Sequence, residues 1–150
     1  MPQSLSNILV HLIFSTKNRE PLINDNIAAE LHPYLAALFR VRESPALTIN
    51  GTEDHIHALF ALSRTQTVAG IVEEVKTQSS KWIKIKGPLF YNFHWQTGYG
   101  AFSIGRSSEQ SLRKYIAEQK QHHRKKTFQD EYRTFLRKYG VEYDERYVWD

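Results

Sequence analysis

The chain has 150 residues and a formal net charge of +4 at pH 7, and it contains no cysteine. That length accommodates one domain with its own core. The lack of cysteine excludes disulfide frameworks, thiolate nucleophiles and iron–sulfur clusters. No apolar run reaches the roughly 18 residues of a membrane-spanning helix, and the opening MPQSLSN lacks the charged start of a signal peptide. We therefore expect a single domain over residues 1–150, located in the cytoplasm and without a membrane partner.

Positive charge is concentrated in the C-terminal half of the chain. Residues 1–75 hold 5 Lys and Arg against 8 Asp and Glu, whereas residues 76–150 hold 15 against 8. Aromatic residues make up 13% of the chain, and many lie in the same basic half. This combination suits a single-stranded nucleic acid, because cations meet phosphates and rings stack on bases. The alternative explanation is a solvated, lysine-rich helix surface.

The first third of the chain predicts a strand, a helix and a hairpin. The apolar, partly β-branched run Ile8–Ser15 is typical of a buried strand. Asn24 or Asp25 can cap the following helix. Its apolar residues recur at helical spacing: Ile27, Leu31, Leu35 and Leu38. Ala46–Asn50 and His55–Leu62 predict two strands that pair as a hairpin.

A second helix and two further strands follow. Thr65 or Thr67 can cap this helix, and a Gly-Pro pair at 87–88 ends it. Its apolar stripe consists of Val68, Ile71, Val72, Val75, Ser79, Trp82 and Ile83. Phe90–Trp95 and Ala101–Ile104 predict strands on either side of a glycine-containing turn.

Two basic helices are predicted in the C-terminal third. Ser107 and Gln110 form a capping box for a helix that runs to about Lys126, and Phe128–Tyr139 predicts another. The last ten residues are expected to form an extended arm. The order β-α-β-β-α-β predicts an α+β, ferredoxin-like (split βαβ) antiparallel sheet with helices on one face, followed by C-terminal basic helices. Such a sheet leaves its other face open for a ligand or partner.

His55 and His57 flank Ile56 in the third predicted strand. Because side chains alternate between the faces of a strand, both imidazoles project from one face and Ile56 enters the core on the other. Two imidazoles on one face can form half of a metal site, and Asp54 can orient one of them. A solvent-facing pair of histidines has the same spacing, so the motif alone leaves both interpretations open.

Tyr115 and Gln119 lie four residues apart in a predicted helix and therefore share one of its faces. A phenol with a pKa near ~10 is a poor nucleophile, but it becomes effective against a phosphate that a metal polarises. Gln119 offers a neutral oxygen that suits a hard cation. An interfacial tyrosine and a surface glutamine would fit this segment equally well.

Taken together, the two motifs resemble the single-tyrosine HUH transposases of small bacterial insertion sequences, the IS200-like superfamily. Further stretches carry the resemblance over nearly the whole chain: HLIFSTKNR, TEDHIH, VEEVKTQSSKWI, WQTGYGAFSI, YIAEQKQHHRKKTF and FLRKYGVEYDERYVWD.

This resemblance implies an enzyme that cleaves and rejoins single-stranded DNA with hairpin ends. It implies that His55, His57 and Gln119 bind one Mg²⁺ or Mn²⁺ ion. Tyr115 would attack the scissile phosphate, leaving a 5′-phosphotyrosine and a free 3′-hydroxyl. It also implies a homodimer with composite active sites, in which the tyrosine of one subunit meets the histidines of the other.

The basic segments provide candidate phosphate contacts. The residues expected to bind DNA are Lys76, Lys81, Lys120, Arg124, Lys125 and Lys126. His122 and His123 are expected to face DNA as polar residues and not to ligate metal.

Two alternative functions remain open at this point. One is a non-catalytic, single-stranded nucleic-acid-binding protein with an open sheet like that of RNA-recognition (RRM) domains. The other is a domesticated relative of the transposases that cleaves chromosomal repeats.

Overall fold

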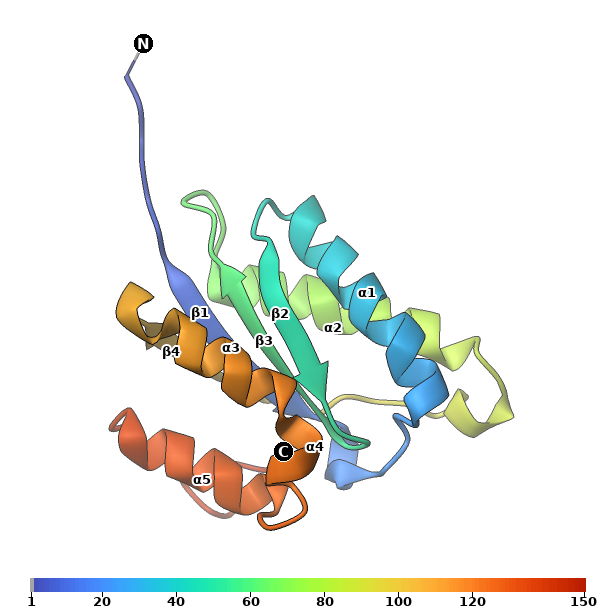
Figure 1. Ribbon diagram of the computed structural model, residues 1–150. Helices are drawn as coiled ribbons and strands as arrows, with labels where there is room; N and C mark the ends of the chain where they lie inside the picture. The colour runs from blue at the N-terminus through green and yellow to red at the C-terminus, as the bar shows by residue number, and fades with distance from the viewer. Residues whose placement is uncertain (1) are drawn as a thin grey trace.

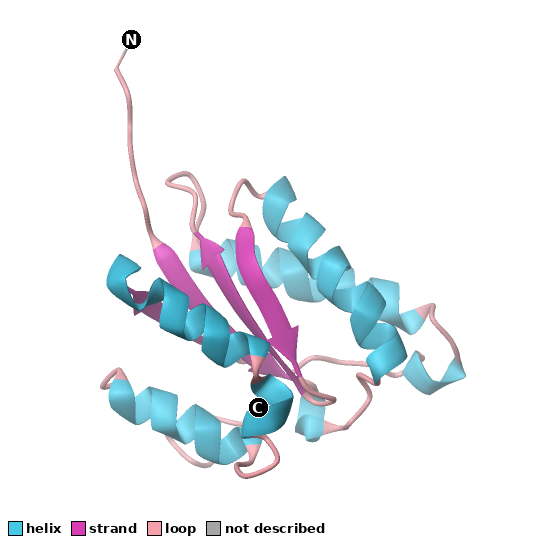
Figure 2. Cartoon of the chain, viewed as in Figure 1, coloured by secondary structure: helices cyan, strands magenta, loops and turns pink. Residues whose placement is uncertain are grey.

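The computed structural model describes residues 2–150, and its centre is one antiparallel sheet with strand order β2-β3-β1-β4 (Figures 1 and 2). The strands are β1 (Leu9–Ser15), β2 (Ala46–Gly51), β3 (His55–Ala61) and β4 (Gly100–Ile104). The helices are α1 (Asp25–Val41), α2 (Val68–Lys84), α3 (Glu109–Ala117), α4 (Gln119–His122) and α5 (Phe128–Lys138). This order of strands is that of a ferredoxin-like sheet, so the predicted α+β fold is confirmed.

Helices α1 and α2 cover one face of the sheet (Figure 1). Both helices begin at a predicted cap: Asn24 Oδ1 accepts a hydrogen bond from Ile27 N, and Thr67 Oγ1 accepts one from Gly70 N. Such caps satisfy backbone donors that the first helical turn leaves free. The fully buried side chains between the helices and the sheet include Leu12, Phe14, Leu31, Leu35, Phe39, Phe60, Ile71 and Ile83.

Helices α3 and α5 cover the opposite face, which the sequence predicted to be open. Phe102, Phe128, Phe135 and their neighbours form one buried cluster there, and Leu9, Leu59, Leu112 and Ile116 form a second. The expectation of an open face is therefore wrong. The physical reason is that this face carries apolar side chains of its own, which the C-terminal helices bury.

The segment Phe90–Trp95 is not a strand, contrary to the prediction. Pro88–Phe90 forms a 3₁₀ turn, and the only pairing described for the segment is a single bridge between Thr16 and Trp95. Phe90, Phe93 and Trp95 are buried in the core, whereas Tyr91 is exposed to solvent. Trp95 packs against Phe14, and its indole Nε1 donates a hydrogen bond to Ser79 Oγ over 2.9 Å.

The predicted helix from Ser107 to Lys126 is also wrong in its bounds. Ser107 lies in a 3₁₀ turn before α3, and α3 itself ends at Ala117. Asn50 Nδ2 donates hydrogen bonds to the carbonyls of Ile116 and Ala117, at 3.0 and 3.2 Å. These bonds occupy the carbonyls at the helix end, so the chain turns there and the short helix α4 starts afresh.

The last ten residues fold back onto the domain and do not extend as an arm. The predicted last helix is confirmed as α5, and it is closed by Gly140, which has a φ of +65°. After it, Tyr143, Val148 and Trp149 pack partly buried against the α5 cluster, and Gly98 N donates to the carbonyl of Asp150 over 2.8 Å. Within residues 2–150, no helix combines the length and apolar character needed to cross a membrane.

Ile56 tests the assignment of the two sheet faces. Its side chain is buried in the α1–α2 core, so Ile56→Ala should lower the free energy of unfolding by about 2–5 kcal/mol. Ile85→Ala serves as the control, because Ile85 is 80% exposed and its truncation should change stability by less than about 0.5 kcal/mol. Urea denaturation of both variants measures the difference, and equal stabilities would contradict the assignment.

Candidate active site

The two histidines of β3 are fully buried between the sheet and the C-terminal helices. His55 Nδ1 lies 2.7 Å from Asp54 Oδ1 and 2.9 Å from Thr52 Oγ1, as the sequence suggested for Asp54. His57 Nδ1 lies 2.8 Å from Nε2 of His11, a buried residue of β1. These contacts fix the orientation of both rings, and both Nε2 atoms point toward the same region.

Glu131 of α5 occupies that region, and it is not among the site residues expected from the sequence. Its side chain is 2% exposed, and its Oε1 lies 2.8 Å from His57 Nε2, 3.2 Å from His123 Nε2 and 3.6 Å from His55 Nε2. One feature of the sequence could have indicated that Glu131 belongs to the site. Glu131 is a charged residue at a buried helical position, spaced with the apolar residues Phe128 and Phe135.

Tyr115 and Gln119 meet the other oxygen of the same carboxylate. Glu131 Oε2 accepts a hydrogen bond from the Tyr115 hydroxyl and one of 3.3 Å from Gln119 Nε2. Gln119 is fully buried, and its Oε1 lies 3.0 Å from His55 Nε2. The Tyr115 ring lies 6.1 Å from the His57 ring. All four catalytic and metal-binding candidates from the sequence therefore come together within one chain.

The environment fixes the protonation states of three of these groups. Burial lowers the pKa of His57 to about 4, so its imidazole is neutral at pH 7. Burial and the nearby Glu131 carboxylate raise the pKa of Tyr115, which keeps the phenol protonated. Burial acts against ionisation of Glu131, but the adjacent imidazoles of His123 and His57 outweigh it and hold the pKa of this carboxyl below its usual range.

His55, His57, His123 and Glu131 form what we call the His–Glu cluster. One donor atom from each lies within 4.8 Å of the others. Nε2 of His123 is buried and has no hydrogen-bond partner, although Glu131 Oε1 is near it. Imidazoles and a carboxylate are divalent-metal ligands, so this donor set fits a metal ion. The expectation that His123 faces DNA is wrong, because its side chain is only 12% exposed and turns into the cluster.

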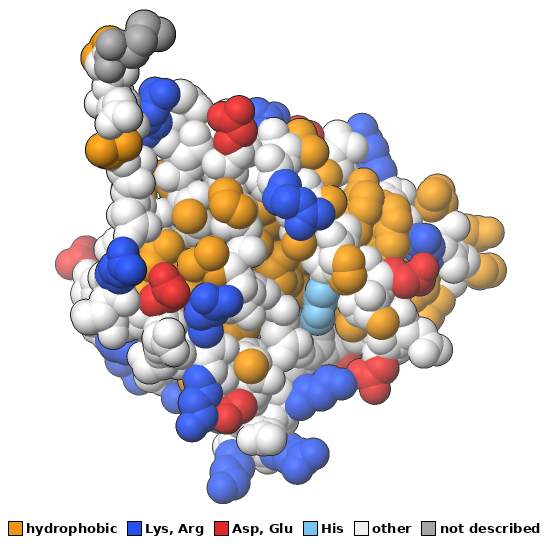
Figure 3. All heavy atoms as spheres, turned by 45° about the horizontal axis from the view of Figure 1, so that its top comes forward, with side chains coloured by type: hydrophobic (Ala, Val, Ile, Leu, Met, Phe, Trp, Pro, Cys, Tyr) orange, Lys and Arg blue, Asp and Glu red, His pale blue; other side chains and the backbone are white. Residues whose placement is uncertain are grey.

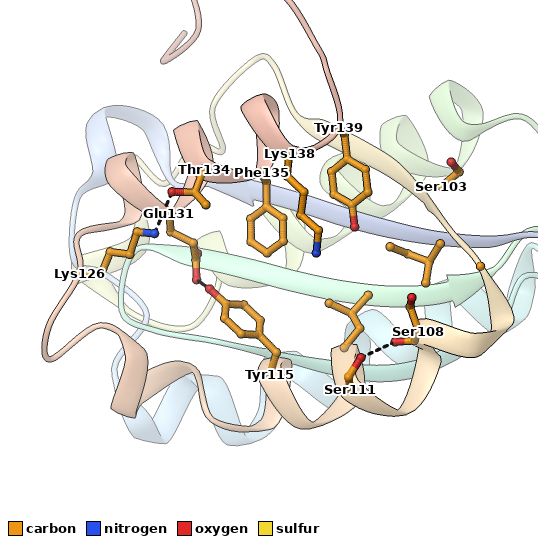
Figure 4. A pocket seen from close by; sticks show the side chains of 13 residues that line it. Ser103, Ser108, Ser111, Tyr115, Lys126, Glu131, Thr134, Phe135, Lys138 and Tyr139 are labelled. Carbon is orange, nitrogen blue, oxygen red and sulfur yellow. Dashed lines mark hydrogen bonds between the residues drawn. The ribbon is translucent and has the colours of Figure 1, made fainter.

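A cavity of about 470 Å³ between α3 and α5 gives access to Tyr115 and Glu131 (Figure 4). Figure 4 shows the Tyr115 hydroxyl directed at the Glu131 carboxylate, with Lys126 and Thr134 beside it. Both apolar side chains, such as Leu112 and Phe135, and polar ones, such as Ser108, Ser111 and Lys138, line the cavity. A ligand that enters it can therefore reach the tyrosine hydroxyl.

Apart from Lys120, the expected DNA-binding residues lie on two separate parts of the surface. Arg124, Lys125 and Lys126 belong to the loop between α4 and α5 (residues 123–127, the basic loop), where they line a groove together with Tyr115. Lys81 and Lys76 line another groove on α2. In the view of Figure 3, Lys and Arg side chains gather along the lower edge of the molecule.

Two of the expected DNA-binding lysines have partners within the chain. Lys76 Nζ donates to the carbonyls of Gln96 and Gly98, at 2.8 and 2.6 Å, and holds the turn before β4. Lys120 forms an ion pair with Asp25 at the start of α1.

The fold is that of solved transposase structures. A protein of Deinococcus radiodurans R1 described as a transposase has a TM-score of 0.62 and 19% identity, with 79% of this chain and 98% of that chain covered. A REP-associated tyrosine transposase bound to a REP hairpin also has a TM-score of 0.62, with 15% identity and coverage of 82% and 72%. No curated protein sequence matches the chain.

The family match is more specific than the likeness of fold. The family described as IS200-like transposases matches residues 4–119. The chain therefore belongs to the IS200-like transposases. The match includes His55, His57, Tyr115 and Gln119, and it ends before His123 and Glu131.

Lys76 has a structural role in the turn before β4, whereas Lys81 lies on the surface, and mutation can test this difference. Lys76→Met should lower the free energy of unfolding by about 1–3 kcal/mol, because it leaves the carbonyls of the turn without their charged donor. Lys81→Met is the matched control on the same helix, and its stability should equal that of the wild type. Thermal unfolding followed by circular dichroism compares them, and an unchanged stability of Lys76→Met would contradict the structural role.

Proposed function

We propose that this transposase family member is a metal-dependent enzyme that cleaves and rejoins single-stranded DNA through a covalent bond to Tyr115. The observation that carries the proposal is the meeting of the Tyr115 hydroxyl with His55, His57 and Gln119 in one buried site that opens to a cavity. A tyrosine placed only for packing would not need a polar cluster of this kind beneath its hydroxyl.

The donor set supports a bound Mg²⁺ or Mn²⁺ ion, as the resemblance implies. The resemblance assigns it to His55, His57 and Gln119, and Asp54 and His11 would fix the two imidazole rings from behind. When bound, the ion supplies Lewis-acid polarisation of the scissile phosphate and orients it for attack.

Tyr115 performs the covalent step in this proposal. As the phenolic oxygen attacks phosphorus its proton becomes acidic, and it passes to Glu131 Oε2, which already accepts the hydrogen bond of this hydroxyl. The phenolic oxygen bonds to phosphorus, and the bond from phosphorus to the 3′-oxygen breaks. The 3′-oxygen takes up a proton from water to become a hydroxyl, and the 5′ end remains on Tyr115. Attack by another 3′-hydroxyl reverses the step, so the bond energy is retained without ATP.

The basic loop supports a single-stranded DNA substrate. Arg124, Lys125 and Lys126 lie in the groove that contains Tyr115, where they can hold phosphates on either side of the cleaved bond. We propose hairpin-bearing DNA as the substrate. The fold likeness to a transposase bound to a REP hairpin supports this choice. A domesticated repeat-cleaving role would use the same chemistry on chromosomal repeats.

A homodimer with composite sites is also part of the proposal, on the basis of the resemblance. In a single chain, Tyr115 already lies beside its own His57. Mixing Tyr115→Phe with His57→Ala therefore distinguishes the arrangements. Exchange of the tyrosine between subunits would restore an active site in the mixture, whereas pairing within one chain would not.

The covalent step has a direct test. Wild-type protein incubated with hairpin-bearing single-stranded DNA and Mg²⁺ or Mn²⁺ should give a protein–DNA adduct on a denaturing gel. Tyr115→Phe should give none, because the ring remains but the nucleophile is removed. His57→Ala should abolish cleavage and leave DNA binding largely intact. An adduct that persists in Tyr115→Phe would overturn the assignment of the nucleophile.

The basic loop makes a separate prediction about DNA binding. Replacing both Arg124 and Lys125 by Ala should weaken single-stranded DNA binding and reduce the slope of log affinity against log salt by about 0.7 for each phosphate that the loop no longer neutralises. Arg40→Ala combined with Arg64→Ala, two exposed changes outside the basic loop, is the control matched in net charge. Fluorescence anisotropy over a range of salt concentrations measures both, and parallel slopes for the loop variant and the wild type would refute the proposed phosphate binding.

A further inference from the structure

The His–Glu cluster contains two donors that the resemblance did not imply. His123 and Glu131 lie outside the residues matched by the family, in the basic loop and in α5. Both side chains nevertheless turn into the same site as His55 and His57. Their position calls for an explanation, because a buried carboxylate is costly unless it is paired.

Glu131 divides its two oxygens between different partners. Oε2 receives the hydrogen bonds of Tyr115 and Gln119. Oε1 faces only imidazoles, with the Nε2 atoms of His57, His123 and His55 at 2.8, 3.2 and 3.6 Å. Three ring nitrogens from two segments of the chain, β3 and the basic loop, therefore converge on one carboxylate oxygen.

The contacts behind His55 determine which of its nitrogens is free. Ionised Asp54 can only accept a hydrogen bond, so His55 Nδ1, at 2.7 Å, carries the proton. The other ring nitrogen, Nε2, faces Gln119 Oε1 at 3.0 Å and Glu131 Oε1 at 3.6 Å.

His123 supplies a further unused donor atom. Its Nε2 is buried, has no hydrogen-bond partner and lies beside Glu131 Oε1. Its ring contacts the His55 ring, with 4.5 Å between centroids, and Phe128 also stacks on His55, at 4.6 Å. The ring is thus held at the site by packing, and its Nε2 faces the cluster 3.2 Å from Glu131 Oε1 without forming a hydrogen bond.

We propose that His123 and Glu131 are metal ligands together with His55 and His57, and that the site prefers a first-row transition-metal ion to Mg²⁺. The inference rests on the proposed function in that it concerns the same site. It replaces the expected set of two imidazoles and an amide with three imidazoles and a carboxylate. Imidazole nitrogens suit the later first-row ions such as Co²⁺ and Zn²⁺, whereas Mg²⁺ prefers oxygen ligands and retains water.

Gln119 has a different part in this arrangement. Its Nε2 donates to Glu131 Oε2, the oxygen that also receives the Tyr115 hydroxyl. Gln119 therefore positions the carboxylate with respect to the cluster. The two ligand sets can be distinguished by mutation. Metal binding should weaken on loss of His123 or Glu131 in the set proposed here, and on loss of Gln119 in the set that the resemblance implies.

The test is calorimetric titration of the full chain, without DNA, with Co²⁺, Mn²⁺ and Mg²⁺ separately. Wild-type protein should bind Co²⁺ more tightly than Mn²⁺, and Mn²⁺ more tightly than Mg²⁺. His123→Ala and Glu131→Gln should each weaken Co²⁺ binding by at least about 10- to 100-fold. The matched controls His94→Ala and Glu142→Gln alter exposed residues and should bind as the wild type does.

A folding defect is separated from ligand loss by a second variant and a second measurement. Glu131→Asp retains a carboxylate and should recover part of the affinity that Glu131→Gln loses. Co²⁺ should also raise the thermal unfolding temperature of the wild type more than that of either ligand variant, because an ion that binds only the folded state stabilises it. Circular dichroism without metal verifies that each variant is folded.

The inference is overturned if folded His123 and Glu131 variants bind Co²⁺ like the wild type, or if Mg²⁺ binds as tightly as Co²⁺. Loss of binding in Gln119→Ala alone would also overturn it, in favour of the set that the resemblance implies. A different result would refute the proposed function. In that case no protein–DNA adduct would form with any of the ions, although the metal titrations still followed the expected pattern.

Discussion

The burial of one ionised carboxylate, Glu131, constrains the arrangement of the whole C-terminal half. A charge in a protein interior requires partners that compensate for its lost hydration. Glu131 finds them on three separate segments: His57 of β3, Tyr115 of α3 and His123 of the basic loop. The position of α5 on the sheet is therefore tied to the chemistry of the site. A shift of this helix would leave the carboxylate without partners.

The alternation of side chains along β3 separates the core from the site. Ile56, Ala58 and Phe60 enter the α1–α2 core, and His55 and His57 project from the other face. Because β3 is an inner strand with partners on both sides, its backbone is held by two ladders. A site on such a strand keeps its donor atoms in register, which positioning of a reacting phosphate requires.

Charge is used in two ways in the basic half of the chain. The basic loop presents Arg124 and Lys125 beside Tyr115, where phosphate contacts would serve the reaction. Lys76 instead binds backbone carbonyls of the turn before β4. Its positive charge therefore stabilises the fold and is not free to bind DNA. The excess of Lys and Arg after residue 75 thus has both structural and surface components, and only the surface component can account for affinity for DNA.

Local patterns in the sequence determined the sheet, the caps of α1 and α2, and the shared face of His55 and His57, because each depends on residues within a few positions of one another. Resemblance added Tyr115 and Gln119. The sequence did not reveal Glu131 and His123 as members of the site, nor that α3 and α5 would cover the second face. These features depend on contacts between distant segments, such as the approach of α5 to β3, where Glu131 meets His57 across a sequence separation of 74. The end of α3 has the same origin, since the side chain of Asn50 takes the carbonyls that would have continued the helix. Periodicity reports which face of an element is apolar, but only the folded chain decides which other element covers that face.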